Sequence, residues 1–148
     1  MQKREMRGEE IMSDKTYIDV LLVKPMMKPE VVRIEDSLEA MQDLVGGYIE
    51  SYMPFEEEVA IVCNEEGKLR GAMPNRGIYD KEGNLQDIIA GDFFICYAPI
   101  ESESFLSLSE EQIKEYTEKF KNPEMFYRGD HGNIVGKVIT NEVIEMER

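Results

Sequence analysis

The chain has 148 residues, 42% of them hydrophobic, which is the length and composition of one folded domain rather than of a disordered protein. Its 17 basic and 31 acidic residues leave a formal net charge of −14, so the surface repels nucleic-acid phosphates and anionic membranes. No stretch reaches the roughly 20 apolar residues that a membrane-spanning helix needs, and we expect a soluble cytoplasmic protein.

Residues 1–16 carry no hydrophobic period and are predicted to form a disordered leader ahead of the domain. The residues just before Met12 can be encoded by purine-rich codons that resemble a bacterial ribosome-binding site. We therefore hypothesise that translation starts at Met12. Mass spectrometry of the native N-terminus tests this, and a product that begins at Met1 would contradict it.

The segments after the leader predict a hairpin followed by a helix. Tyr17–Val23 and Glu30–Ile34 are rich in β-branched residues, and two prolines between them interrupt the strand pattern. Asp36 can cap a helix, with Glu39 three positions further on, as in a capping box. A glycine pair ends this helix. Its apolar stripe consists of Leu38, Met41 and Val45.

The centre of the chain contains two turns of similar composition, Asn64–Lys68 and Asp80–Asn84, each opened by Asn or Asp and each containing a glycine. We expect both turns to join strands as hairpins, with Gly67 and Gly83 at positive φ. Between the turns, Gly71–Gly77 is predicted to be an irregular loop. The strands predicted around these turns are Tyr48–Met53, Val59–Cys63, Leu85–Ile89 and Asp92–Ala98.

The second helix has the clearest local pattern. Ser109 is predicted to be its N-cap and Gln112 the reciprocal partner in a capping box. Leu108 and Ile113 occupy the two positions of a hydrophobic staple. The apolar stripe of this helix consists of Ile113, Tyr116 and Phe120.

These elements predict an α+β fold: a mixed, mostly antiparallel sheet with two amphipathic helices packed on one face. We expect a single domain over residues 17–126. Residues 127–148 are predicted to add a turn, an edge strand at Ile134–Ile139 and a frayed end.

The central loop and its surroundings form the most site-like group, with Arg70, Asn75, Arg76 and Tyr79 as candidate ligand- or partner-binding residues. An Arg in such a loop can make bidentate hydrogen bonds to a carboxylate or phosphate, and an Asn side chain offers both a hydrogen-bond donor and an acceptor. The alternative is a structural loop in which Asn75 caps backbone groups and Arg76 pairs with a neighbouring Glu.

Other chemistry-bearing residues give weaker patterns. Asp130 and His131 are adjacent and could form an acid–base pair, but no nucleophile motif accompanies them, so a solvated turn is the simpler reading. Cys63 and Cys96 with a single His match no zinc pattern, and we expect two buried free thiols. We therefore predict no catalytic residues, no metal and no cofactor.

Several motifs in order resemble the domain of unknown function 3846 family, over about residues 17–126. They are VGGYIE (Val45–Glu50), VAIVCNEEGKL (Val59–Leu69), PNR (Pro74–Arg76), DIIAGDFFI (Asp87–Ile95) and the LSEEQIKEYTEKF helix. The resemblance implies an α+β fold in a small protein of Firmicutes, their phages and plasmids. It brings no established activity and no catalytic residues.

Three functions follow as expectations. The first is a non-enzymatic accessory protein of a phage or mobile element that binds a host protein and antagonises a defence factor. The second is a protein that sequesters a nucleotide-like small ligand against the arginines of the central loop, with a homo-oligomer interface as one location for the site. The third is an acidic DNA mimic of the antirestriction type, for which the net charge of −14 is the basis.

Overall fold

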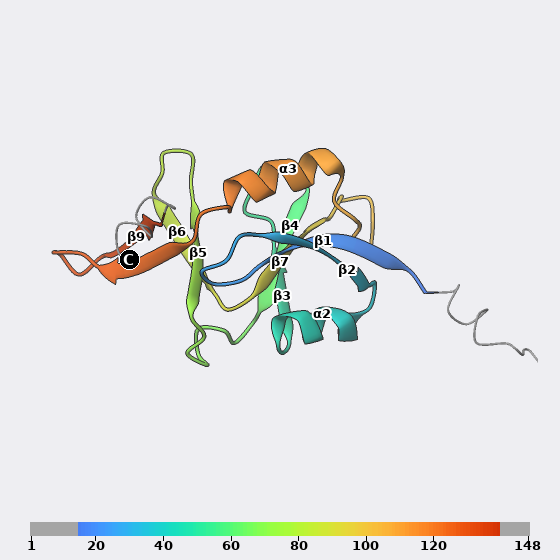
Figure 1. The fold of residues 1–148 in the computed structure, drawn as a ribbon, viewed down its shortest axis with the longest axis horizontal. Helices are drawn as coiled ribbons and strands as arrows, with labels where there is room; N and C mark the ends of the chain where they lie inside the picture. Colours follow the sequence, from blue (N-terminus) through green and yellow to red (C-terminus); the bar gives the residue numbers. More distant parts are fainter. Residues whose placement is uncertain (1–14, 140–148) are drawn as a thin grey trace, which may run out of the picture.

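The computed structural model describes residues 15–139 and is organised around one five-stranded antiparallel sheet (Figure 1). The predictions for the leader up to residue 14, including a start at Met12, and for the frayed end from residue 140 lie outside the described residues. The strand order is β2-β1-β7-β4-β3. These strands are β1 (Tyr17–Val23), β2 (Glu30–Glu35), β3 (Ile49–Tyr52), β4 (Val59–Asn64) and β7 (Phe93–Tyr97).

The two helices, α2 (Leu38–Val45) and α3 (Glu110–Lys119), cover opposite faces of this sheet (Figure 1). The α+β class and the antiparallel sheet are confirmed, but the prediction that both helices pack on one face is wrong. Successive strand residues point to opposite faces, and the three central strands are apolar on both. Each face therefore needs its own cover. Met41 and Val45 of α2 pack on one face, and Tyr116 and Phe120 on the other.

The ends of the helices follow local rules. In α3, Ser109 accepts a hydrogen bond from the Gln112 amide, and the Gln112 side chain accepts one from the Ser109 amide, so the predicted capping box is confirmed. The N-cap of α2 is Ser37 rather than the predicted Asp36. Leu38 is 59% exposed, so the predicted apolar stripe of α2 is reduced to Met41 and Val45.

A second, two-stranded sheet consists of β5 (Pro74–Tyr79) and β6 (Leu85–Ala90). The turn at Asp80–Asn84 joins them as a hairpin, with Gly83 at φ +87°, as predicted. The turn after β4 was also predicted to form a hairpin, and this is wrong, because the chain leaves the main sheet there and does not return until β7.

Gly67, in the turn after β4, does not adopt the predicted positive φ. It is buried, and a Cβ built on it would lie 2.7 Å from the carbonyl oxygen of Ala90. Glycine is therefore needed at this position because two backbone segments approach each other closely, and not because of its φ angle.

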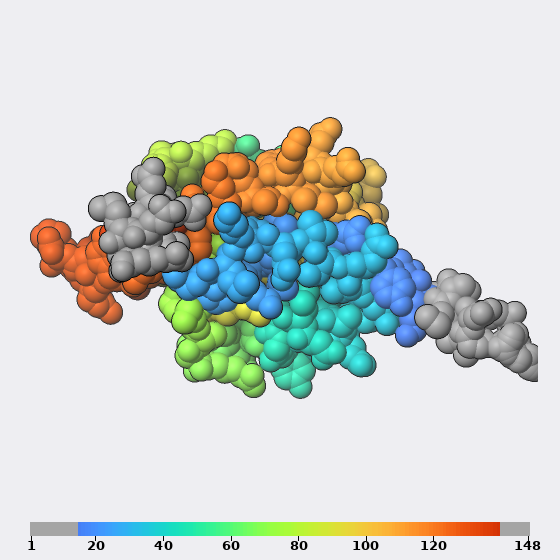
Figure 2. Space-filling model, viewed as in Figure 1, coloured from blue at the N-terminus to red at the C-terminus, as the bar shows by residue number. Residues whose placement is uncertain are grey.

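A third sheet pairs β8 (Glu124–Arg128) with β9 (Ile134–Val138), and this hairpin projects from one end of the molecule (Figures 1 and 2). The predicted strand at Ile134–Ile139 is present, but its partner β8 was missed. The hairpin begins before residue 126, so it spans the predicted domain boundary. Within residues 15–139, no helix is long and apolar enough to cross a membrane.

Candidate functional site

The four residues predicted to bind a ligand lie in three different environments. Asn75 and Arg76 are fully buried on β5, Tyr79 is 38% exposed at the end of the same strand, and Arg70 is on the surface. Arg70 lies near Glu66, with 3.5 Å between Nε and Oε1. The structure therefore does not bring the predicted group together as one site.

Arg76 uses its guanidinium to hold three segments of its own chain. Nη2 donates to the carbonyl oxygen of Met27 at 2.7 Å, and both Nε and Nη2 donate to that of Phe120, at 3.1 and 2.8 Å. Nη1 donates to Asn75 Oδ1 at 2.8 Å. Asn75 in turn donates to the carbonyl oxygens of Val23 and Gly91. These contacts match the structural alternative for Asn75, while Arg76 binds carbonyl groups rather than the expected Glu.

Tyr79 also makes an internal contact. Its hydroxyl donates to Glu124 Oε2 at 2.5 Å, and Glu124 Oε1 accepts from the amide of Gly77 at 2.9 Å. Burial, followed by the nearby Glu124 carboxylate, raises the pKa of Tyr79. The pair fastens β8 to β5. Asp130 and His131 are exposed in the turn between β8 and β9, as expected for a solvated turn.

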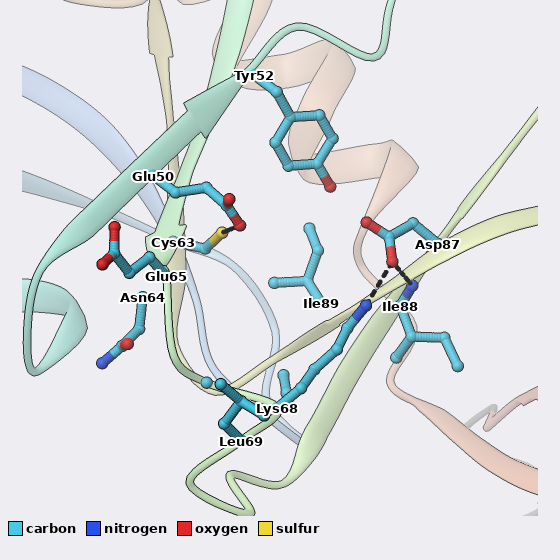
Figure 3. Close-up of a pocket in the computed structure, with 12 residues that line it drawn as sticks. Glu50, Tyr52, Cys63, Asn64, Glu65, Lys68, Leu69, Asp87, Ile88 and Ile89 are labelled. Atoms are coloured by element: carbon cyan, nitrogen blue, oxygen red, sulfur yellow. Dashed lines mark hydrogen bonds and ion pairs between the residues drawn. The ribbon is translucent and has the colours of Figure 1, made fainter.

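A pocket with several polar side chains lies elsewhere, between the edge of the main sheet and β6 (Figure 3). Its volume is about 290 Å³. One wall comes from β3 and β4, the floor from the turn after β4, and the other wall from β6. The side chains that shape its polar interior are Glu50, Tyr52, Cys63, Lys68 and Asp87. We call this space the Tyr52 pocket.

Strand register explains how two of these residues meet. Glu50 on β3 lies opposite Cys63 on β4, and the Cys63 thiol donates to Glu50 Oε1 at 3.9 Å. Tyr52 is two positions further along β3, and residues two apart share a face of the sheet. Its ring therefore extends over the same pocket as Glu50.

The opposite wall contains an ion pair. Lys68 Nζ lies 2.6 Å from Asp87 Oδ1, and the same oxygen accepts from the amide of Ile88 at 2.8 Å (Figure 3). Within residues 15–139, Asp87 Oδ2 makes no hydrogen bond. One acceptor of this carboxylate therefore remains available to the pocket.

The Tyr52 hydroxyl is the least satisfied polar group of the pocket. It is shielded from solvent and has no hydrogen-bond partner among the described residues. Figure 3 shows it directed into the pocket, on the side of Asp87. A buried hydroxyl without a partner is unfavourable by about 1–3 kcal/mol, so such groups need an explanation. A ligand that fills the pocket would supply the missing partner.

The electrostatics of the pocket favour neutral or positively charged groups. Burial, followed by the charges of Glu50 and Asp87, raises the pKa of the Cys63 thiol to about 11. Burial and the charge of Asp87 also raise the pKa of Tyr52. The thiol is therefore protonated at neutral pH and is a poor nucleophile or metal ligand. No group of three His, Cys, Asp or Glu side chains within residues 15–139 is placed to hold a metal ion.

Sequence reasoning missed this pocket. Cys63 was predicted only as a buried free thiol, which is confirmed, and Lys68 only as a turn residue. The spacing of Glu50 and Tyr52 on one strand was the available local signal. Asp87 could not be placed opposite them from the sequence, because its position depends on the path of the chain after β4 rather than on local pattern.

Comparison with known proteins gives one family match. No curated protein and no solved structure matches the chain. The family model described as "Domain of unknown function (DUF3846)" matches residues 18–121, from β1 to just beyond α3. The chain therefore belongs to this family, as its motifs predicted.

Proposed function

We propose that this protein acts by binding, and that its Tyr52 pocket takes a small ligand with a protonated amine or guanidine group. The observation that carries the proposal is the buried Tyr52 hydroxyl, which has no partner within the described residues and points into the pocket. A hydroxyl can accept a hydrogen bond from such a ligand, and nearby carboxylates can accept others.

The charges around the pocket support a cationic ligand over an anionic one. Glu50, Glu65 and Asp87 line it, and within residues 15–139 Lys68 is its only basic lining residue, already paired with Asp87. The lining thus has two more negative charges than positive ones, and like charges in a partly buried site repel strongly. A nucleotide-like ligand is less well supported, because Arg76 is buried against carbonyl groups and Arg70 lies outside this pocket.

The burial and the raised pKa of the Cys63 thiol support binding over catalysis. Cys63 is 5% exposed, and its thiol donates to Glu50 and has its pKa raised by burial. A nucleophile needs the opposite environment, one that stabilises its thiolate. We place this binding activity in the accessory role of a phage or mobile element that the family resemblance implies. There it would act on host defence by sequestering a small cationic metabolite.

Thermal unfolding in the presence of small molecules tests the proposal. Agmatine carries both a guanidinium and an ammonium group, and we expect it to raise the melting temperature in a concentration-dependent manner. Adenosine monophosphate, an anion of the nucleotide class, is expected to have no such effect. A stabilisation by the nucleotide but not by agmatine would contradict the proposed ligand class.

Two matched variants locate the effect. Tyr52→Phe removes the unpartnered hydroxyl, whereas Tyr48→Phe removes a hydroxyl from a tyrosine that is 68% exposed and lies outside the pocket. Agmatine is expected to stabilise Tyr48→Phe as it does the wild type, and to stabilise Tyr52→Phe less. Equal stabilisation of both variants would place the binding site elsewhere.

A further inference from the structure

A second hollow adjoins the Tyr52 pocket and shares part of its wall. Its volume is about 670 Å³, and it lies between the chain segment before β5, the strand β6 and the turn end of the β8–β9 hairpin. The residues common to both spaces are Lys68, Asp87, Ile88 and Ala90. We call this second space the Ile134 hollow.

The two spaces differ in chemistry. The Tyr52 pocket has a hydroxyl, a thiol and carboxylates in its lining beside aliphatic side chains, whereas the Ile134 hollow is bounded largely by aliphatic groups. Its polar lining outside the shared wall is limited to two amide side chains. The aliphatic residues that line it outside the shared wall are Ala72, Pro74, Leu85 and Ile134.

The Lys68–Asp87 ion pair forms the boundary between the two spaces. The Lys68 side chain is 62% exposed and that of Asp87 is 45% exposed, so their attraction is screened by solvent and contributes little to stability. Asp87 is also held by the amide of Ile88, whereas the Lys68 ammonium makes no other hydrogen bond within the described residues. Lys68 is therefore the partner that a competing cation can displace.

We propose that the ligand of the Tyr52 pocket is an amphiphilic cation. Its protonated head binds among Tyr52, Glu50 and Asp87, and its apolar chain passes Lys68 into the Ile134 hollow. The inference rests on the proposed binding function and adds the class of the ligand. It follows from the shared wall, since a molecule that extends beyond the Lys68–Asp87 boundary enters a space whose remaining lining is aliphatic except for two amide side chains.

A series of alkylguanidines tests separately whether the Tyr52 pocket binds the cationic head and whether the Ile134 hollow binds the apolar chain. Methyl-, ethyl-, butyl- and hexylguanidine have the same cationic head and differ only in apolar length. We expect the Kd to fall by about twofold to fourfold for each added methylene once the chain reaches the hollow, as apolar burial predicts. If the short guanidines bind and added length changes nothing, this inference fails while the proposed function stands. If no guanidine binds, both fail.

Two variants on β9 provide a matched pair for the same titrations. Ile134 and Val138 are 49% and 46% exposed and lie four positions apart, on the same face of the strand. Only Ile134 lines the hollow. Ile134→Ser should reduce the gain from butyl- to hexylguanidine and leave methylguanidine unaffected, while Val138→Ser should behave as the wild type. A length dependence that is the same in both variants would overturn the assignment of the hollow.

Discussion

The guanidinium of Arg76 is surrounded by oxygens from three segments: the loop after β1, its neighbour Asn75 on β5, and the C-terminal end of α3. Arg76 is fully buried, so no water reaches its charge. The charge therefore needs hydrogen bonds from the protein itself. The Arg therefore fastens α3 and the first hairpin to the second sheet.

Replacing Arg76 by Ala is expected to lower the free energy of unfolding by about 3 kcal/mol or more, because the carbonyl groups of Met27 and Phe120 lose their donors inside the protein. Arg70→Ala is the control. Its side chain is 61% exposed, and we expect a change within about 0.5 kcal/mol. Chemical denaturation measures both. Wild-type stability in Arg76→Ala would mean that the guanidinium does not hold these segments.

Tyr52 presents the opposite case, a buried polar group without a partner in residues 15–139. Tyr52→Phe keeps the ring and removes the hydroxyl, so we expect the ligand-free protein to be as stable as the wild type or more stable by up to about 1 kcal/mol. Denaturation in urea at neutral pH checks this. A loss of more than about 1 kcal/mol would show that the hydroxyl has a structural partner.

Gly83 and Gly67 are required for two different physical reasons, backbone conformation and close approach of another segment. Gly83 has φ +87° and open space around its Cα, so Gly83→Ala should destabilise the protein by about 1 kcal/mol through backbone strain alone. At Gly67 a Cβ would lie 2.7 Å from a backbone oxygen, and the turn or β6 would have to move. We therefore expect Gly67→Ala to be the more damaging of the two. Thermal unfolding of both variants decides the order, and the reverse order would contradict this account of the first turn.

The elements that the sequence predicted well are those determined by neighbouring residues. β1 and the capping box of α3 depend on local apolar pattern and on side chains three positions apart. The side of the sheet that α2 covers, and the sheet that β5 joins, depend on contacts between distant segments. β8 was missed because it follows α3 closely and lacks a clear alternation.

The residues of the predicted site do not lie together, for a related reason. Asn75 and Arg76 were chosen because polar residues in a loop between two turns are typical of binding sites. Those residues belong to a strand whose neighbours cover it completely, a fact that no local pattern shows. The Tyr52 pocket combines residues from β3, β4, the following turn and β6, so it exists only once the second sheet is placed against the first.

The molecule as a whole contains two buried thiols, one on each face of the main sheet. Burial raises the pKa of Cys63 from 9.0 to about 11 and that of Cys96 to about 12. In the unfolded chain both thiols ionise near pH 9, whereas the folded state keeps them protonated to higher pH. Their contribution to stability is therefore complete below pH 9 and is lost as the pH rises from 9 towards 12.

Urea denaturation between pH 7 and pH 10.5 should show this loss, with a slope approaching about 1.4 kcal/mol per pH unit for each thiol that ionises only in the unfolded state. Cys63→Ala, measured over the same range, should have a shallower slope. A stability that stays constant above pH 9 in the wild-type protein would contradict the burial of both thiols.

Calorimetric titration of agmatine at low ionic strength measures whether the Tyr52 pocket binds a small cation. We expect the wild type and Tyr48→Phe to bind agmatine with equal affinity, and Tyr52→Phe to bind it about tenfold more weakly, as the loss of one buried hydrogen bond predicts. Low salt preserves the attraction between the cation and the carboxylates of Glu50 and Asp87. Equal affinity in all three proteins, or no binding to the wild type, would contradict the account.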